Sequence, residues 1–377
     1  MNYKEIKRQN NEKIRAYAPR EGDGTVGFYP RYIQIEQTNR CNAECIMCNH
    51  FYLENRGCTD LSAEVVARLE KILPYCTTVM LNGDGEPFLS RQVLDIIECY
   101  AKYGVAIGTN TNLTVVPEKA WHYLAHYFQF LNISCDGASK ETYELIRKNL
   151  SFESFIGNLK RLQKEAPDLR RNLDCVVMKQ NICELPDIVR LAADHGVSSV
   201  RFQRLGVNPL IGNELDRPEY YHGLVQQKLA EAEAVGREYG ISVVRPHYQP
   251  AGEQENIPPM QELQAEVKRR KRDCERYAHL SLENDYYSER ITQRDLQNGL
   301  WDAGKPCQWA IERCYIDLKG NVTTCCFNMK KYMGNILEQD FEDIWNAEAY
   351  RTFRKLMGQK KLPDFCKNCN WIIESKL

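Results

Sequence analysis

Three closely spaced cysteines are the residues of this chain with the clearest capacity for chemistry. Cys41, Cys45 and Cys48 have the spacing C-x3-C-x2-C, and the next cysteine along the chain is Cys58. Three thiolates at this spacing can hold one face of a cubane iron–sulfur cluster, which leaves one iron open to a small molecule. The alternatives are three reduced thiols or a zinc knuckle, in which His50 supplies the fourth ligand that structural zinc requires.

The cysteine motif resembles the signature of the radical SAM enzymes. In that family the open iron of a [4Fe-4S] cluster binds the amino and carboxylate groups of S-adenosylmethionine. One electron from the cluster cleaves the sulfonium, and the 5′-deoxyadenosyl radical removes a hydrogen atom from the substrate. The resemblance implies that Cys41, Cys45 and Cys48 hold the cluster and that Met47 contacts S-adenosylmethionine. It also implies an electron donor such as flavodoxin or ferredoxin.

A second group of six cysteines lies within residues 307–369. Its members are Cys307, Cys314, Cys325, Cys326, Cys366 and Cys369. So many cysteines in a short region indicate a metal site, and their spacing fits zinc and iron–sulfur equally well.

This region resembles the auxiliary-cluster region of SPASM and twitch radical SAM enzymes, in which a cysteine precedes G-x4-C and a distant C-x2-C pair. The resemblance implies Cys307, Cys325, Cys366 and Cys369 as ligands, with Cys314 and Cys326 as substitutes. The later cysteines of the full SPASM pattern are missing after Cys369, which favours one auxiliary [4Fe-4S] cluster.

A glycine-containing turn follows the second predicted strand. On its own the run Asn82-Gly83-Asp84-Gly85-Glu86-Pro87 reads as an ordinary turn between a strand and a helix. Next to the cysteine motif it resembles the GGEP element, which binds the amino group of S-adenosylmethionine. Asp84 breaks the double glycine, so that only Gly83, Gly85, Glu86 and Pro87 carry over.

Polar residues at the ends of later strands are further candidates. Ser134, Asn181 and Asn110 lie where the family places groups that contact the ribose or carboxylate of S-adenosylmethionine. Arg201 can bind a carboxylate through its planar guanidinium, or it can form a structural ion pair.

Cys135 and Asp136 are the two candidates for a catalytic role, because they follow a strand at the predicted mouth of the sheet. A thiol near the radical can donate a hydrogen atom, as in radical SAM epimerases. The alternative for Cys135 is a small buried hydrophobic residue, which is the common environment of a free cysteine.

The segments that must position these residues alternate between strand and helix patterns. Strands are predicted at 32–35, 78–81, 105–109, 130–134, 174–178, 200–203 and 241–244, and helices at 61–73, 91–103, from 139, 185–195 and 220–239. This alternation predicts an α/β fold with a parallel sheet and ligands at the carboxyl ends of its strands. Periodicity fits a doubly wound sheet as well as a barrel. The resemblance implies a partial (β/α)6 TIM-like barrel with a small C-terminal α+β domain.

Four parts of the chain are expected. They are a lead-in at 1–30, a barrel at 31–245, a charged helical linker or cap at 246–300 and the auxiliary-cluster domain at 301–377. The charged run 265–273 favours a solvated linker helix over a substrate cap. In the last part, a hairpin is predicted around 319–321 and one helix over 340–357.

Composition narrows the class of protein. The 377 residues are 43% hydrophobic and 27% charged, and 50 basic residues against 51 acidic ones give a net charge of −1. This balance provides no attraction to nucleic acid or a membrane surface, and no apolar run resembles a signal peptide or a membrane span. We therefore expect a cytoplasmic protein, in which 16 cysteines favour metal or redox chemistry over disulfides.

The resemblance implies a radical SAM oxidoreductase or epimerase. Only residues 1–30 precede the first predicted strand, so we expect no leader-peptide-binding module and favour a small polar substrate. A sugar, aminocyclitol or polyol would be oxidised or epimerised at one carbon. The alternatives are radical modification of a peptide or protein, as by RiPP maturases and sulfatase-maturing enzymes, and a zinc-binding interaction protein without catalysis.

Overall fold

The structure is a computed structural model. It describes residues 2–18, 22–48, 50, 59–207, 211–251, 256–277, 289–291, 293, 296, 301–302, 307, 309–326, 331–363 and 366. The chain divides into two compact units. The first comprises Met1–Arg40, Cys58–Thr109 and Asn284–Leu377, and the second comprises Cys41–Gly57 and Asn110–Glu283. None of the described helices combines the length and the apolar character that a membrane span requires.

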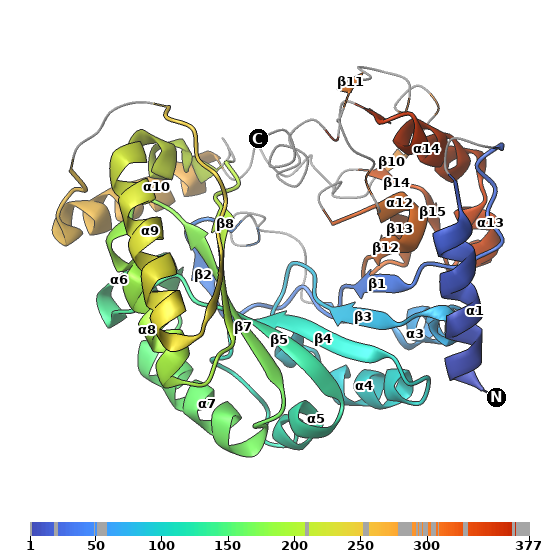
Figure 1. Ribbon diagram of the computed structural model, residues 1–377, viewed down its shortest axis with the longest axis horizontal. Helices are drawn as coiled ribbons and strands as arrows, with labels where there is room; N and C mark the ends of the chain where they lie inside the picture. Colours follow the sequence, from blue (N-terminus) through green and yellow to red (C-terminus); the bar gives the residue numbers. More distant parts are fainter. Residues whose placement is uncertain are drawn as a thin grey trace. The chain divides into compact units, whose positions relative to one another are not determined.

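A mixed sheet forms the centre of the first unit (Figure 1). Its strands neighbour one another in the order β15 (Gly334–Asn335), β13 (Asn321–Thr323), β12 (Arg313–Ile316), β1 (Tyr32–Ile35), β3 (Thr78–Leu81) and β4 (Ala106–Thr111), whose end from Asn110 belongs to the second unit. β1 runs parallel to both β3 and β12, so that Ile33 lies between Val79 and Cys314. β12 and β13 form the hairpin predicted around 319–321, which is confirmed.

The first unit brings together segments that are distant in the sequence. Because β1 pairs with β12, the first strand and the C-terminal segment belong to the same compact unit. The smaller strand pairs of this unit are β10 (Glu289–Arg290) with β14 (Lys331–Tyr332) and β11 (Trp301–Asp302) with β16 (Lys361–Leu362).

Helices cover the sheet of the first unit. They are α1 (Tyr3–Ala16), α3 (Ala63–Leu69), η1 (Leu73–Tyr75), η2 (Pro87–Leu89), α4 (Val93–Ala101), α12 (Trp309–Glu312), α13 (Phe341–Trp345) and α14 (Glu348–Gly358). Ser62 caps α3 by accepting a hydrogen bond from the amide of Val65, as its position before the helix predicts. The single helix predicted over 340–357 is wrong, because α13 ends at Trp345 and Ala347 is extended before α14 begins.

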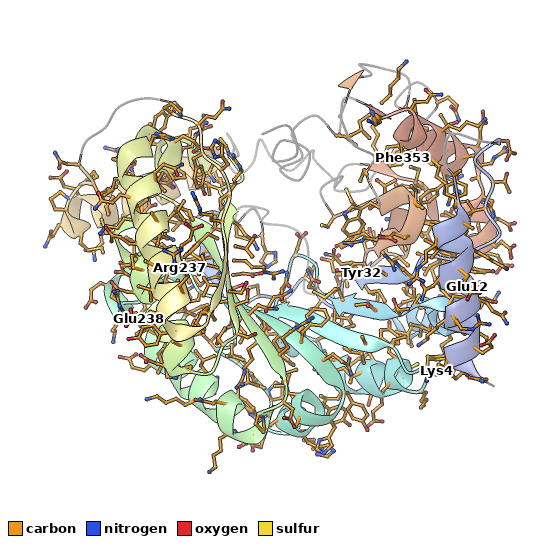
Figure 2. All side chains as sticks on the ribbon, viewed as in Figure 1. Lys4, Glu12, Tyr32, Arg237, Glu238 and Phe353 are labelled. Carbon is orange, nitrogen blue, oxygen red and sulfur yellow. The ribbon has the colours of Figure 1, made fainter. Side chains whose placement is uncertain are left out.

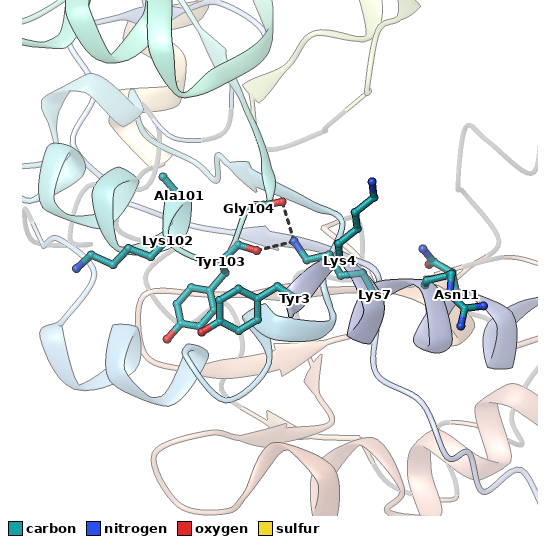
Figure 3. A pocket seen from close by; sticks show the side chains of 9 residues that line it. Tyr3, Lys4, Lys7, Asn11, Ala101, Lys102, Tyr103 and Gly104 are labelled. Atoms are coloured by element: carbon teal, nitrogen blue, oxygen red, sulfur yellow. Dashed lines mark hydrogen bonds between the residues drawn. The ribbon is translucent and has the colours of Figure 1, made fainter. Parts of the chain in front are cut away.

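Helix α1 lies within residues 1–30, which the sequence analysis describes only as a lead-in. Its buried residues are Lys7, Asn10 and Ile14. Nζ of Lys7 donates to the carbonyls of Tyr103 and Gly104, each at 2.7 Å, beside a pocket of about 620 Å³ (Figure 3). Polar residues that satisfy backbone groups hold this helix, and the sequence therefore lacks a clear apolar stripe.

The second unit contains a sheet of parallel strands. Their order is β5 (Phe128–Ser134), β7 (Arg170–Val177), β8 (Ser199–Arg204) and β9 (Ser242–Val244). A short antiparallel pair joins β2 (Glu44–Cys45) to β6 (Arg147–Lys148). The helices are α5 (Ala120–His126), α6 (Lys140–Ile146), α7 (Phe152–Glu165), η3 (Ile182–Glu184), α8 (Leu185–Asp194), η5 (Glu214–Asp216), η6 (Pro218–Tyr220), α9 (His222–Tyr239) and α10 (Met260–Tyr277).

Burial follows the amphipathic patterns of these elements. Along β7, Leu173, Cys175 and Val177 are buried and alternate with partly buried residues, as the two-residue period of a strand requires. On α9, Arg237 and Glu238 are exposed, while Val225 and Leu229 are buried (Figure 2). Strands that alternate with helices and pair in parallel confirm the predicted α/β class.

Helix α10 corrects a second expectation. The charged run 265–273 was expected to form a solvated helix, but Leu263, Val267 and Arg270 are buried. Leu263 and Val267 belong to one apolar core cluster with Ile46 and Met178. The spacing of four and three residues between these positions forms one helical face, which the many charges of the segment conceal in the sequence.

Candidate active site

The cysteine motif is a tight loop of the second unit. Cys45 lies on β2 and is paired with Arg147 of β6. The amide of Cys48 donates to the carbonyl of Cys45 at 3.0 Å, and the amide of Ile46 donates to the carbonyl of Ile146 at 3.0 Å. This turn fixes the backbone that carries Cys45 and Cys48.

An apolar core packs against the cysteine loop. Ile46 is buried in one cluster with Leu145, Ile146, Met178, Leu205, Leu263 and Val267. Met47, predicted to contact S-adenosylmethionine, is partly buried and packs against this cluster. Ile46 and Met47, the two residues between the second and third cysteines, therefore attach the loop to this core by apolar packing.

Burial disfavours the thiolate form of two cysteines of the loop. Burial raises the pKa of Cys45, and it raises the pKa of Cys48 to about 12, with further contributions from Cys45 and Cys41. Within the described residues, no three His, Cys, Asp or Glu side chains form a ready-made metal cage. The fit to a [4Fe-4S] cluster therefore rests on the donor set: three thiols on one short loop.

Arg147 faces the loop and was not identified from the sequence. Its Nη1 lies 3.7 Å from Sγ of Cys45, and its Nη2 lies 2.7 Å from Oδ2 of Asp136. The amide of Val176 donates to the other oxygen of Asp136 at 2.7 Å. The two-residue pairing of β2 and β6 creates this contact, and a ladder so short has no sequence periodicity that could have revealed it.

The structure places both predicted catalytic residues inside the second unit. Cys135 is fully buried, its Sγ donates to the carbonyl of Gly137 at 3.3 Å, and burial raises its pKa to about 12. This environment matches the alternative of a small buried hydrophobic residue. Asp136 is fully buried as the counter-ion of Arg147, and burial raises its pKa while Arg147 opposes that rise.

The loop Gly83–Pro87 lies in the first unit and is held by close backbone approach. A Cβ at Gly85 would lie 2.4 Å from the carbonyl oxygen of Thr38 and 2.5 Å from that of Arg40. The amide of Glu86 donates to the carbonyl of Arg40 at 2.7 Å. Glycine at position 85 therefore lets this loop rest directly on the segment that leads into the cysteines.

The neighbouring residues of the same loop are also fixed. A Cβ at Gly83 would lie 2.3 Å from Cγ of Glu36, whose carboxylate accepts a hydrogen bond from the amide of Asp84 at 3.1 Å. Glu86 is buried and caps η2, in which Pro87 is the first residue.

A ladder of asparagines crosses the strands of the second unit. Nδ2 of Asn132 donates to Oδ1 of Asn110 at 2.8 Å, and Nδ2 of Asn172 donates to Oδ1 of Asn132 at 3.0 Å. Asn132 and Asn172 are register partners on β5 and β7. Predicted site residue Asn110 is thus joined to two amides that the sequence analysis did not single out.

The next row toward the carboxyl ends of these strands is also polar. Ser134 is the register partner of Asp174, which is the register partner of Arg201. Nε and Nη2 of Arg201 each lie 2.7 Å from a carboxylate oxygen of Asp174. The sequence left open whether Arg201 binds a ligand or forms an ion pair, and the structure shows the ion pair. Side chains two residues apart on one strand share a face, so this row and the asparagines line the same face.

Asn181 is committed to the protein backbone. Its Oδ1 accepts from the amide of Met178 at 2.9 Å, and its Nδ2 donates to the carbonyls of Asp136 at 3.0 Å and Val176 at 2.9 Å. It closes the turn after β7, and these bonds do not favour its predicted contact with S-adenosylmethionine.

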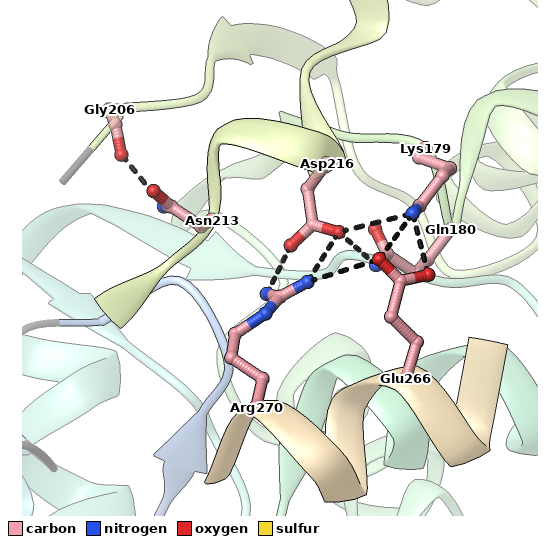
Figure 4. A network of polar contacts seen from close by, with 7 residues as sticks. All are labelled: Lys179, Gln180, Gly206, Asn213, Asp216, Glu266 and Arg270. Carbon is pink, nitrogen blue, oxygen red and sulfur yellow. Dashed lines mark hydrogen bonds and ion pairs between the residues drawn. The ribbon is translucent and has the colours of Figure 1, made fainter. Parts of the chain in front are cut away.

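Buried charges fix α10 onto the second unit. Asp216 is fully buried, accepts from both terminal nitrogens of Arg270 and accepts from Gln180 at 2.6 Å (Figure 4). Nζ of Lys179 lies 2.7 Å from Glu266 and 3.8 Å from Asp216. Two cations and two carboxylates thus join α10 both to the turn that follows β7, through Lys179, and to η5, through Asp216.

The C-terminal cysteines have different environments. Cys314 is fully buried on β12 beside Ile33, and burial raises its pKa well above the ordinary value, so it is part of the core of the first unit. Cys307, Cys325, Cys326 and Cys366 are partly exposed, as accessible ligands would be. Cys369, the last predicted ligand, lies outside the described residues.

Two family models match the chain. The model of the radical SAM superfamily matches residues 35–192, and that of the SPASM iron–sulfur cluster-binding domain matches residues 307–370. They contain the first and second groups of cysteines, respectively. The two matches show that the cofactors are S-adenosylmethionine, a [4Fe-4S] cluster and auxiliary iron–sulfur.

Relatives with known names are similar to this chain over different lengths. The tungsten-containing aldehyde ferredoxin oxidoreductase cofactor-modifying protein of Pyrococcus furiosus is 23% identical over 369 residues, which are 90% of this chain and 87% of that protein. The S-adenosyl-L-methionine-dependent 2-deoxy-scyllo-inosamine dehydrogenase of Niallia circulans is 39% identical over 72 residues, which are 18% of this chain and 29% of that protein.

A solved structure shows the same fold. SuiB of Streptococcus suis bound to precursor peptide SuiA superimposes with a TM-score of 0.57 at 14% identity, covering 90% of this chain and 68% of that one. At this identity the likeness concerns the fold alone. Taken together, the thiol loop, the parallel α/β sheet and the two matched domains show that the chain belongs to the radical SAM superfamily and carries a C-terminal SPASM-type iron–sulfur domain.

Proposed function

We propose that this radical SAM enzyme removes a hydrogen atom from a small polar molecule, such as a sugar, aminocyclitol or polyol, and thereby oxidises or epimerises it at one carbon. The observation that carries the proposal is the polar face of the second unit. It presents the asparagine ladder and, one row further, Ser134, Asp174 and Arg201.

Hydroxyl and amino groups of such a substrate need several fixed donors and acceptors. Asp174 and Arg201 are partly exposed despite their ion pair. A carboxylate supplies acceptors and a guanidinium supplies donors, and a polyhydroxylated ring requires both for a defined orientation. The ion pair also holds each partner in one rotamer, so that little side-chain ordering remains when the substrate binds.

The cofactor, when bound, supplies a carbon radical strong enough to remove hydrogen from an unactivated carbon, and the protein supplies binding and orientation. We propose Cys41, Cys45 and Cys48 as ligands of the first cluster. We further propose Cys307, Cys325, Cys366 and Cys369 as ligands of one auxiliary cluster, with Cys326 as a substitute. A flavodoxin or ferredoxin in the cytoplasm is the proposed one-electron donor.

The parts of S-adenosylmethionine are assigned to one loop and to two side chains of the polar face. The amino group is assigned to the loop Gly83–Pro87, whose backbone is fixed by its contacts with Thr38 and Arg40. The ribose and carboxylate are assigned to Asn110 and Ser134, which share the polar face with Arg201. Each assignment is a binding role and needs no proton transfer by these residues.

One relative supports a small polar substrate, and one solved structure supports a peptide substrate as the second candidate. The local similarity to a 2-deoxy-scyllo-inosamine dehydrogenase favours an aminocyclitol. The fold shared with SuiB, solved with a precursor peptide, favours peptide modification as the second candidate.

Deuterium transfer distinguishes the two candidates. Reduced enzyme is incubated with S-adenosylmethionine and ring-deuterated aminocyclitols, inositols or hexoses, and 5′-deoxyadenosine is analysed by mass spectrometry. We expect deuterium in 5′-deoxyadenosine from at least one ring compound. Transfer from Cα- or Cβ-deuterated peptides, with none from any ring compound, would contradict the proposal and establish the second candidate.

A further inference from the structure

A buried cation lies against the cysteine loop, and the proposed reaction does not use it. Arg147 and Asp136 are both buried, and the guanidinium of Arg147 contacts both Cys45 and Asp136. The charged group therefore lies between one proposed cluster ligand and one carboxylate. A buried guanidinium with a single counter-ion is costly to maintain, which calls for a reason beyond packing.

The fold holds this guanidinium at its position from both sides. Helix α6 separates Asp136 from Arg147, and its start is fixed by Glu184, which accepts from the amides of Ala138 and Ser139 and from the hydroxyl of Ser139. At the other end of α6, the pairing of β6 with β2 places Arg147 beside Cys45.

The turn between Asp136 and α6 is equally constrained. A Cβ at Gly137 would lie 2.5 Å from the amide nitrogen of Tyr143. The helix therefore packs directly on the residue that follows Asp136. With both ends of the segment fixed, the backbone of Arg147 cannot move away from the cysteine loop without breaking the β2–β6 pair.

Charge near a cluster ligand changes the energy of the added electron. Reduction makes the cluster more negative by one charge, and a nearby cation that donates a hydrogen bond to a ligand sulfur stabilises the reduced form more than the oxidised form. A carboxylate on the far side of the cation weakens this effect. The sign is fixed: the cation raises the reduction potential, and its counter-ion lowers it.

We propose that Arg147 raises the reduction potential of the cluster held by Cys41, Cys45 and Cys48 and that Asp136 limits this increase. Arg147 is a positioning residue, because it acts on the cluster through Sγ of Cys45. The inference rests on the proposed ligand set.

The test measures the midpoint potential of the loaded cluster by a dithionite titration followed by electron paramagnetic resonance. The spectrum of a Cys41→Ala/Cys45→Ala/Cys48→Ala variant is subtracted to remove the auxiliary signal. For Arg147→Gln, we expect the ratio of reduced to oxidised cluster at a fixed potential to fall by roughly tenfold, which is about 59 mV for one electron. Arg147→Lys, which keeps the charge, should recover most of the shift.

Asp136→Asn removes the negative charge next to Arg147. The midpoint potential of the cluster should therefore rise in this variant, which is opposite to the change expected for Arg147→Gln. Arg171→Gln is the matched control. Arg171 is a buried arginine of β7 that donates to the carbonyl of Pro167. On the same strand it lies roughly five residues before Val176, whose amide donates to Asp136. The midpoint potential of the cluster in Arg171→Gln should equal that in the wild type.

Three outcomes would overturn the inference. They are an unchanged potential in Arg147→Gln with full iron content, a shift of the same sign in Arg147→Gln and Asp136→Asn, and an equal shift in Arg171→Gln. If Arg147→Gln does not load iron, Asp136→Asn still decides the sign, and Arg147→Lys, which keeps the charge, should keep a midpoint potential close to that of the wild type. Failure of the ligand set is recognised separately, because the triple cysteine variant would then retain all its iron.

Discussion

Two loops that the sequence assigns to the same cofactor are built by different physical means. In the second unit, the cysteine loop is flanked by side chains: the Arg147–Asp136 ion pair and the apolar cluster around Ile46, to which α10 contributes Leu263 and Val267. In the first unit, the loop Gly83–Pro87 is held by main-chain contact with Thr38 and Arg40.

The difference shows how each loop can tolerate change. A loop held by buried charges depends on the balance of charge, because removing one partner leaves the other uncompensated in a medium of low dielectric constant. A loop held by backbone contact depends on the size of one side chain, because the opposing backbone atoms cannot rotate away. Substitutions that change charge should therefore destabilise the second unit most, and substitutions that add volume should destabilise the loop of the first unit.

The largest effect is expected in the charged part of the second unit. Asp216→Ala leaves Arg270 and Lys179 buried without their shared carboxylate and should lower the free energy of unfolding by about 3–5 kcal/mol. Urea unfolding followed by circular dichroism measures this loss. The control is Glu118→Ala, which removes an exposed carboxylate from the ion pair with Arg161 and should have a much smaller effect. Equal losses in the two variants would show that buried charge does not hold α10.

A smaller loss is expected from crowding in the first unit. Gly85→Ala places a methyl group within 2.5 Å of two carbonyl oxygens and should lower the free energy of unfolding by about 1–3 kcal/mol, because the backbone must shift. Gly27→Ala is the matched control, since Gly27 has no atom within 4 Å of the added carbon. The same unfolding measurement applies. If Gly85→Ala has the same free energy of unfolding as the wild type, the loop is not held by direct backbone contact at Gly85.

The smallest effect concerns pH. Burial and the hydrogen bond to Glu342 raise the pKa of Tyr29 from 10.0 to about 12. The unfolded chain therefore loses this proton first, so the contribution of Tyr29 to stability is present below pH 10 and is lost as the pH rises to about 12. Wild type should lose more stability between pH 8 and pH 11 than Tyr29→Phe, which keeps the ring stacked on Tyr75. An identical loss in both proteins would exclude this titration.

Regular patterns made much of the fold predictable from the sequence. Alternating strands and helices predicted the α/β class, and Ser62 marked the start of α3. The cysteine motif was recognisable because its chemistry depends on local spacing. In each case, the determining residues lie within a few positions of one another.

Other features depend on contacts between distant residues. Helix α10 was expected to be solvated, because the sequence does not reveal that Glu266 and Arg270 find buried partners in Lys179 and Asp216. The polar face was only partly recognised, because Asn132, Asn172 and Asp174 lie inside strands and become neighbours through register. Arg147 was missed for the same reason: a two-residue ladder brings it to Cys45.

The central claim is that Cys41, Cys45 and Cys48 hold the cluster that cleaves S-adenosylmethionine. The most direct measurement is iron, sulfide and zinc content together with 5′-deoxyadenosine formation, in anaerobically reconstituted wild type and in the triple alanine variant. We predict about eight irons per wild-type chain, for two [4Fe-4S] clusters, and loss of about half the iron and of all cleavage in the variant. Undiminished iron and cleavage in the variant, or zinc in place of iron in the wild type, would contradict the account.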